Sequence, residues 1–288
     1  MSERPSWLKV RVPTPAEAEG MKAVRNVLEA HRLTTICQGA LCPNAVECWS
    51  ARTATFMILG ETCTRACRFC AVRTGDPGGV IDEGEPARVA AAVRELALRH
   101  VVLTSVDRDD LPDGGAAVFA QTAREIRRAS PGSVVELLLP DFSGDSQSLG
   151  RVVESDADVL GHNVETVARL TSALRDRRAS YPQSLAVLRF LAAGAPRRTI
   201  KSGLMLGLGE RRDEIRKTLA DLHEAGVRWI TVGQYLPPTN AAAPLRRYVP
   251  PEEFREIETE AREIGFRWVV SGPLVRSSYH AERVYGTP

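Results

Sequence analysis

The chain lacks the features of several common protein classes. It has no stretch of about 18 consecutive apolar residues, so we expect no membrane span. Its N-terminal stretch lacks the apolar run of a secretory signal, and Glu3, Glu17 and Glu19 argue against an acid-poor transit peptide. We therefore expect a cytoplasmic protein that works without a membrane.

Lysine is also scarce, and the net charge of +2 gives no case for nucleic acid as a partner. Lysine occurs only at positions 9, 22, 201 and 217, so arginine carries nearly all of the positive charge. Codon bias is the favoured reading of this pattern, and an arginine-lined surface for an acidic partner is the other reading.

Cysteine is absent from most of the chain, and all six cysteines fall in two sets of three. The first set, Cys37, Cys42 and Cys48, lies in "CQGALCPNAVEC", and the second, Cys63, Cys67 and Cys70, lies in "ETCTRACRFC". In a reducing compartment such clusters indicate metal ligands or catalytic groups rather than disulfides.

Three thiolates hold three irons of a four-iron cluster and leave the fourth iron free to bind a substrate or cofactor. The C-x3-C-x2-C spacing lets one short loop wrap three corners of such a cluster. A structural zinc site is the alternative, but zinc prefers four ligands in C-x2-C pairs, and only Cys67 and Cys70 form such a pair. Buried thiols are a third reading, although these would be scattered over core elements.

Strand and helix patterns alternate along most of the 288 residues, which suffice for one large α/β domain or two small ones. Apolar runs predict strands at 53–60, 100–107, 133–142, 157–165, 199–209, 227–236 and 266–274. Amphipathic segments predict helices at 18–33, 86–99, 114–129, 146–155, 166–193, 211–226 and 250–265. About six β/α units with buried strands imply a parallel sheet, either doubly wound or barrel-like, with ligands at the C-terminal ends of the strands.

C-x3-C-x2-C after the first of these strands, with Phe69 before the last cysteine, resembles the radical S-adenosylmethionine superfamily. The resemblance implies a partial (β/α)6 TIM-like barrel. It also implies a [4Fe-4S] cluster on Cys63, Cys67 and Cys70 whose open iron binds S-adenosylmethionine. Reduction of that cofactor then releases a 5′-deoxyadenosyl radical, which abstracts hydrogen from carbon.

The remaining motifs are similar to those of the lipoyl synthase family. They are "CQGALCPNAVECW", "GETCTRACRFC", "TSVDRDDLPDGG", "HNVETV", "GLMLGLGE" and the terminal "RSSYHA", so the resemblance runs from about Arg4 to Ala281. It implies insertion of two sulfur atoms, at C6 and C8, into an octanoyl chain carried on a lysine of a lipoyl carrier protein. The carrier that the resemblance implies is a lipoyl domain of a 2-oxoacid dehydrogenase or the glycine cleavage H protein.

The resemblance further implies a second [4Fe-4S] cluster, the auxiliary cluster, which donates the sulfur. Its ligands are Cys37, Cys42 and Cys48, with Ser278 as the fourth. A serine oxygen is a hard, weak ligand for iron, which suits a cluster that comes apart. Without the resemblance, Ser277 and Ser278 read as turn residues. If Ser278 joins the three cysteines, the N-terminal and C-terminal segments meet over the mouth of the barrel.

Residues at the ends of the predicted strands offer contacts for the S-adenosylmethionine that the resemblance implies. Thr104, Ser105 and Asp107 follow the second strand and offer partners to a cationic amine, and Asn163 and Glu165 suit its ribose or methionine groups. The glycines of "GLMLGLGE" would let backbone approach the adenine, although a tight turn explains them equally well.

Three parts of the chain follow from this reading: an N-terminal extension (1–52), a core barrel (53–270) and a C-terminal tail (271–288). Two departures from the family pattern stand out. The stretch 237–251 has alanine at 241–243 and lacks a family histidine, and Leu-Gly replaces Phe-Asn before His162. These changes bear on carrier recognition or substrate positioning.

The implied partners are the octanoylated carrier, a reductant such as ferredoxin or flavodoxin, and an iron–sulfur cluster carrier. A biotin synthase-like or methylthiolating enzyme is the near alternative, but such enzymes lack the first cysteine set paired with a terminal serine motif. A non-catalytic iron–sulfur or zinc protein is the alternative from another class. Two incomplete triplets fit it poorly, because each would leave an open metal site.

Overall fold

A computed structural model describes residues 5–8, 13–39, 44–50 and 52–279. The strands are β1 (Thr34–Thr35), β2 (Thr53–Ile58), β3 (Thr62–Cys63), β4 (Arg73–Thr74), β5 (His100–Ser105), β6 (Val134–Leu138), β7 (Val159–Gly161), β8 (Thr199–Leu206), β9 (Trp229–Gln234) and β10 (Trp268–Gly272). The helices are α1 (Pro15–Ala30), α2 (Ile36–Gly39), α3 (Ala45–Ser50), α4 (Glu85–Glu95), α5 (Ala116–Ala129), α6 (Ser146–Val153), α7 (Ala168–Leu174), α8 (Tyr181–Gly194), α9 (Arg212–Glu224) and α10 (Pro251–Ile264). Short 3₁₀ turns lie at Ser6–Leu8 and Phe142–Gly144.

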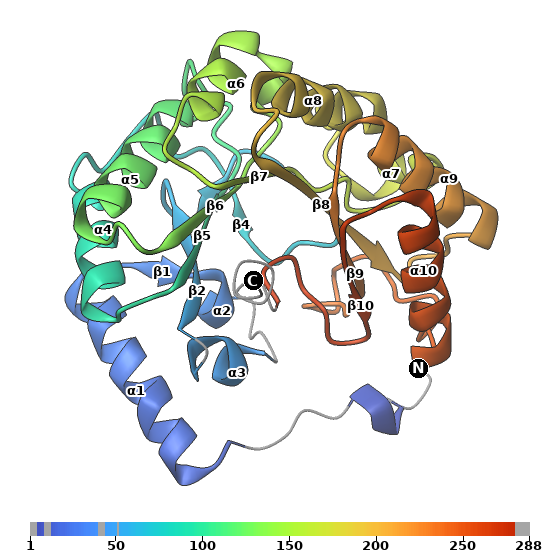
Figure 1. The fold of residues 1–288 in the computed structure, drawn as a ribbon, viewed down its shortest axis with the longest axis horizontal. Coiled ribbons are helices and arrows are strands. Elements are labelled where there is room, and N and C mark those ends of the chain that lie inside the picture. Colours follow the sequence, from blue (N-terminus) through green and yellow to red (C-terminus); the bar gives the residue numbers. More distant parts are fainter. Residues whose placement is uncertain (1–4, 9–12, 40–43, 51, 280–288) are drawn as a thin grey trace.

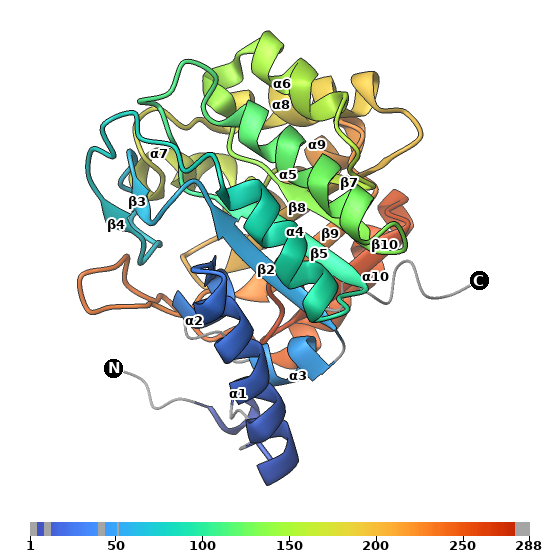
Figure 2. The same cartoon turned by 90° about the vertical axis from the view of Figure 1, so that its left-hand side faces the viewer.

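Seven parallel strands form a curved sheet in the order β2-β5-β6-β7-β8-β9-β10, and β1 adds to β2 as an antiparallel edge. Helices α4, α5, α6, α8, α9 and α10 cover the outer face, α7 lies near β3, and the strands curve around a central space (Figure 1 and Figure 2). The β/α alternation predicted from sequence is confirmed, as is the partial-barrel architecture. Among the described strands the sheet is open, with β1 and β10 at its edges.

Strand β2 shows how alternate side chains divide between the outer core and the barrel interior. Ala54, Phe56 and Ile58 pack in the main core with residues of α4, because alternate side chains of a strand point to opposite faces. Thr53 and Thr55 therefore point toward the inside of the barrel, and both are buried. The cysteine-containing loop with β3 and β4 lies beyond the C-terminal end of β2, while α3 lies near its start (Figure 2).

The N-terminal region is more ordered than the sequence pattern predicts. Helix α1 begins at a capping box in which Thr14 and Glu17 each bond the other's backbone N–H, with Pro15 in the first turn. Two short helices, α2 and α3, follow, and they lie at the open side of the sheet (Figure 1). No helix in the described ranges is long and apolar enough to cross a bilayer.

The N-terminal and C-terminal segments meet at this open side. The Asn44 side chain donates to the carbonyl oxygen of Leu274 over 2.6 Å, and the Tyr279 hydroxyl donates to Glu47 over 2.9 Å. A Cβ added to Gly233 on β9 would collide with the carbonyl oxygen of Val275, so the tail lies close against the inner face of this strand. The two segments therefore meet, as they must if Ser278 and the first cysteine set bind one cluster. The C-terminal segment also contacts the inner face of the sheet.

A buried charged cluster lies inside the barrel, near the N-terminal ends of the parallel strands. The ammonium of Lys201 lies 2.7 Å from Glu136 and 3.8 Å from the centre of the Trp229 ring, and His100 lies 3.1 Å from the other oxygen of Glu136. Glu136 is fully buried, and its charge is tolerated because Lys201 is beside it.

Replacing Lys201 by methionine is expected to destabilise the protein by about 3 kcal/mol, because a buried carboxylate then loses its counter-charge. The double variant Lys201→Met/Glu136→Gln should recover much of this loss, since it buries no unpaired charge. Urea unfolding of the two variants measures the difference. Equal destabilisation of both would show that the charge pairing contributes little.

Candidate active site

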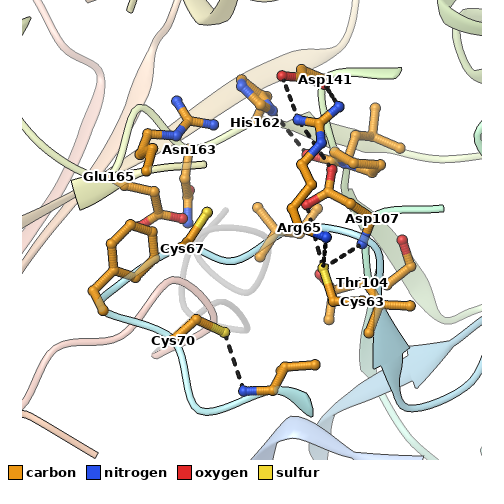
Figure 3. A pocket seen from close by; sticks show the side chains of 18 of the residues that line it. Cys63, Arg65, Cys67, Cys70, Thr104, Asp107, Asp141, His162, Asn163 and Glu165 are labelled. Carbon is orange, nitrogen blue, oxygen red and sulfur yellow. Dashed lines mark hydrogen bonds and ion pairs between the residues drawn. The ribbon is translucent and has the colours of Figure 1, made fainter. Parts of the chain in front are cut away.

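The three cysteines of the second set surround one cavity at the C-terminal end of β2. Cys63 ends β3, which pairs with β4, and the amide of Gly75 donates to its carbonyl oxygen. Cys67 and Cys70 follow in a tight turn in which the amide of Cys70 donates to the carbonyl oxygen of Cys67. All three sulfur atoms point into the shared space (Figure 3).

Each of these sulfur atoms accepts a hydrogen bond from a backbone amide. Donors to Cys63 are Arg65, at 3.4 Å, and Asp107, at 3.3 Å. Asp176 donates to Cys67 over 3.3 Å, and Val72 donates to Cys70 over 3.4 Å. Such bonds stabilise thiolate charge and tune the potential of an iron–sulfur cluster, so the loop is arranged for charged sulfur ligands.

Burial raises the pKa of all three thiols and brings that of Cys67 to about 11. The nearby carboxylates Asp107 and Glu165 contribute to this raised pKa of Cys67, while the hydrogen bond from the backbone amide of Asp176 opposes it. The thiolate forms therefore need a positively charged partner, which iron would supply.

No set of three His, Cys, Asp or Glu side chains in the described part of the chain is arranged around a single metal ion. A four-iron cluster makes a different demand, because each cysteine ligates a different iron and the ligands surround a shared space. The arrangement of Cys63, Cys67 and Cys70 around one cavity fits that group.

Arg65, between the first two cysteines, anchors the loop to the barrel. Its guanidinium contacts Asp109 at 2.7 Å, Asp141 at 2.8 Å and Asp107 at 3.4 Å, and its side chain is only 2% exposed. Burial raises the pKa of Asp107 to about 6, with Arg65 opposing. For Asp109, burial acts in the same direction, but bonds from Arg65 and Thr64 lower the pKa to about 2.

A second anchor comes from the segment between α7 and α8. The carboxylate of Asp176 accepts from the amide of Ala66 over 3.0 Å, and the carbonyl oxygen of Leu174 accepts from the amide of Arg68 over 2.7 Å. Arg178 donates to the carbonyl oxygen of Thr64. Segment 174–178 thus holds the cysteine loop along most of its length.

The cavity brings together all six side chains that the sequence suggests for the cofactor. They are Phe69, Thr104, Ser105, Asp107, Asn163 and Glu165. Burial raises the pKa of Glu165, with Arg175 and Asn163 opposing. With Asp107 and Glu165 on its wall, the cavity suits a ligand that carries positive charge.

Sequence reasoning missed three residues at this site: Arg65, Asp141 and Arg175. Arg175 lines the cavity and donates to Ser184 over 2.7 Å, while its buried Nε has no partner among the described residues. A signal existed for Arg65, which lies inside the cysteine motif, and for Asp141, which directly follows an apolar strand. Arg175 lies in a stretch with several arginines and had no distinguishing signal.

The His162 side chain is held by two internal hydrogen bonds. Its ring nitrogens contact the carbonyl oxygen of Leu139 and the hydroxyl of Ser184, each at 2.9 Å. Burial lowers its pKa to about 4, so the ring is neutral near pH 7.

The glycines of "GLMLGLGE" serve an internal contact. The carboxylate of Glu210 accepts from the amides of Gly207, at 2.9 Å, and Leu208, at 3.0 Å, and also from Gly209. Gly207 has a φ of 104°, which favours glycine. This stretch is therefore a tight turn that the Glu210 side chain stabilises, which agrees with the alternative explanation of these glycines as a tight turn.

The alanine-rich departure at 241–243 packs beside the cysteine loop. The amide of Ala243 donates to the carbonyl oxygen of Arg68 over 2.7 Å, and the Tyr235 hydroxyl donates to the carbonyl oxygen of Ala243 over 2.8 Å. Ala243 is fully buried in a small cluster to which Phe69 also belongs. This change therefore touches the wall of the cavity.

The first cysteine set lies at the open side of the sheet. Cys37 lies on α2 and is buried, Cys48 lies on α3 and is half-buried, and Cys42 lies outside the described residues. Ser278 contacts the hydroxyl of Thr55 at 2.9 Å. Both α2 and α3 pack against β2, the strand that carries Thr55, so the helices with Cys37 and Cys48 and the tail with Ser278 all contact this strand.

Comparison with known proteins decides between the candidate families. Residues 57–222 match the model of the radical SAM superfamily. The chain is 55% identical to the lipoyl synthase of Pyrobaculum arsenaticum, covering 99% of this chain and 96% of that protein. It is 52% identical to the lipoyl synthase of Thermus thermophilus, covering 98% of this chain and 86% of that protein. The chain belongs to the lipoyl synthase family.

Solved structures support the fold. The hydrogenase maturase HydG from Carboxydothermus hydrogenoformans matches with a TM-score of 0.60 at 12% identity, over 94% of this chain and 77% of that one. Streptococcus suis SuiB bound to S-adenosylmethionine matches with a TM-score of 0.57 at 7% identity, over 76% of this chain and half of that one. Lipoyl synthases are radical enzymes that use S-adenosylmethionine and iron–sulfur clusters to insert sulfur, and this chain is a sulfurtransferase of that kind.

Proposed function

We propose that Cys63, Cys67 and Cys70 hold the cluster with which this lipoyl synthase cleaves S-adenosylmethionine. The enzyme inserts two sulfur atoms, at C6 and C8, into the octanoyl chain of a lipoyl carrier protein. The observation that carries the assignment is that three sulfur atoms, each with its own amide donor, surround one cavity. When bound, the cluster would supply the electron and the open iron that this chemistry needs.

The polar residues of the cavity bind and orient the cofactor. Asp107 and Glu165 attract its cationic amino and sulfonium groups, and the hydroxyls of Thr104 and Ser105 offer further hydrogen bonds. Arg175, whose Nε is buried without a partner among the described residues, is placed to receive a carboxylate. Phe69 packs against the small cluster that contains Leu208 and Ala243, and it provides an apolar wall to the cavity.

We assign the sulfur-donating cluster to Cys37, Cys42, Cys48 and Ser278. The location of Cys37, Cys48 and Ser278 beside β2 supports this set, and Cys42 lies outside the described residues. Six cysteines used as metal ligands require a reducing compartment, so we place the enzyme in the cytoplasm. A ferredoxin or flavodoxin would supply electrons, and an iron–sulfur cluster carrier would restore the consumed cluster.

An isotope experiment tests the sulfur source. The protein is reconstituted anaerobically with isotopically heavy sulfide, separated from free sulfide, and mixed with octanoylated carrier, S-adenosylmethionine and a reductant. Both sulfur atoms in the first product should carry the heavy isotope. Product that contains unlabelled sulfur would contradict the assignment of the first cysteine set as donor.

Replacing Ser278 by alanine is expected to leave the radical cluster in place and to abolish sulfur transfer. The variant should still form 5′-deoxyadenosine, because Cys63, Cys67 and Cys70 are unchanged, but it lacks the oxygen ligand of the auxiliary set. Mass spectrometry of the carrier and chromatography of the nucleoside measure the two outcomes. Full lipoyl product from Ser278→Ala would remove Ser278 from the ligand set.

A further inference from the structure

The two neighbouring serines of the C-terminal tail contact opposite sides of the barrel interior. Thr55 on β2 donates to the hydroxyl of Ser278 over 2.9 Å, whereas the amide of Asn163, just after β7, donates to the hydroxyl of Ser277 over 2.9 Å. In the sheet, β5 and β6 separate β2 from β7. One short segment therefore touches two regions at once.

These two regions have different chemistry. Thr55 belongs to β2, against which α2 and α3 with Cys37 and Cys48 pack. Asn163 lines the cavity of Cys63, Cys67 and Cys70, and it lies on the side of that cavity next to Cys67, with Glu165 (Figure 3). The Asn163 side chain also opposes the burial that raises the pKa of Glu165, which lines the same cavity. Ser277 is thus linked through Asn163 to the wall of the cofactor cavity.

The surroundings fix this arrangement from both sides. A Cβ added to Gly203 on β8 would lie 2.7 Å from the side-chain oxygen of Asn163, so glycine leaves the space that this amide occupies. The tail is held by the bond from the amide of Tyr279 to the carbonyl oxygen of Arg276, at 2.9 Å, and by contact of Val275 with β9. The contact between Ser277 and Asn163 therefore lies between the backbone of β8 and the backbone of the C-terminal tail, both of which are held in place.

We propose that Ser277 is a positioning residue for S-adenosylmethionine, acting through Asn163, and that the two tail serines are divided between the two clusters. Ser278 serves the auxiliary set, and Ser277 holds Asn163 and Glu165 in the orientation that receives the cofactor. The tail would then join the site where the radical forms to the site that donates sulfur. This inference rests on the proposed function, because it takes Asn163 as a cofactor contact.

The proposal makes a prediction for a matched pair of variants, Ser277→Ala and Ser278→Ala. Ser277→Ala should keep the full content of about eight irons, for two four-iron clusters. Its affinity for S-adenosylmethionine should fall about five-fold, which corresponds to one neutral hydrogen bond. Ser278→Ala should bind the cofactor like the native protein but show an altered spectrum of the auxiliary cluster.

Equilibrium dialysis with S-adenosylmethionine and electron paramagnetic resonance of the reduced holoprotein measure these effects. Thr55→Val is the matched control, because it removes the corresponding bond at Ser278 and should leave cofactor affinity unchanged. Asn163→Ala should lower the affinity, and adding Ser277→Ala to it should have no further effect, since the two residues act as one unit. Hydrogen exchange of the Val275 and Tyr279 amides reports on the tail independently of catalysis.

Three outcomes would overturn the inference. They are native affinity in Ser277→Ala, additive effects of Ser277→Ala and Asn163→Ala, and equal loss of auxiliary iron in both serine variants. A purely structural role for Ser277 would speed amide exchange in the tail without changing cofactor affinity, which also contradicts it. A native protein that binds no S-adenosylmethionine would instead refute the proposed function.

Discussion

Replacing Cys63 by alanine is expected to abolish the formation of 5′-deoxyadenosine while about four irons remain bound at the auxiliary set. In the proposed assignment Cys63 would hold one corner of the radical cluster, and its sulfur accepts hydrogen bonds from the backbone amides of Arg65 and Asp107. Without this ligand the radical cluster should not assemble, so S-adenosylmethionine should not be reduced. Anaerobic reconstitution, iron and sulfide analysis and chromatography of the nucleoside measure the result.

Cys37→Ala is the matched control, because it removes one ligand from the other set. It should keep the radical cluster and form 5′-deoxyadenosine, yet transfer no sulfur to the carrier. The two variants therefore fail at different steps. If Cys63→Ala still cleaved S-adenosylmethionine, or if Cys37→Ala lost this reaction completely, the assignment of the two triplets would be wrong.

Replacing Arg65 by methionine is expected to destabilise the protein by about 3–5 kcal/mol, which is the typical cost of leaving buried charges without their partner. The guanidinium is the shared counter-charge of three carboxylates, and Asp141 is fully buried. Urea unfolding of the metal-free protein measures the change directly. The cysteine loop should also lose its fixed position, so reconstituted Arg65→Met should retain less iron at the radical site.

Arg178→Ala is the control for this prediction. Arg178 contacts Asp109 at 3.2 Å and Asp176 at 2.8 Å, but its side chain is 40% exposed. Exposed ion pairs contribute up to about 1 kcal/mol, so this variant should stay close to the native stability. A destabilisation of Arg178→Ala as large as that of Arg65→Met would show that burial of the Arg65 network is not the cause.

Much of the fold was predictable because buried parallel strands leave a strong pattern. The run at 53–60 is mostly apolar, and the structure places β2 there with every residue buried. The order of strands and helices follows from the same pattern. Whether the sheet curves into a partial barrel depends on packing between distant strands, and the residues alone left that open until the family resemblance supplied it.

The candidate site was predictable in part, because chemistry-bearing residues follow the ends of parallel strands. Thr104, Asp107, Asn163 and Glu165 were found in this way, and the structure gathers them around one cavity. Arg175 was missed because its loop carries no periodic pattern, and only tertiary structure brings it to the cavity. The link between Asn163 and Ser277 joins residues far apart in sequence, so no local signal predicts it.

The most direct test of the account is an anaerobic reaction of the reconstituted protein with an octanoylated carrier, S-adenosylmethionine and a reductant. Mass spectrometry of the carrier should show the gain of two sulfur atoms, with consumption of two S-adenosylmethionine molecules. Formation of 5′-deoxyadenosine without any gain of sulfur on the carrier would contradict the account and indicate a radical enzyme with another substrate.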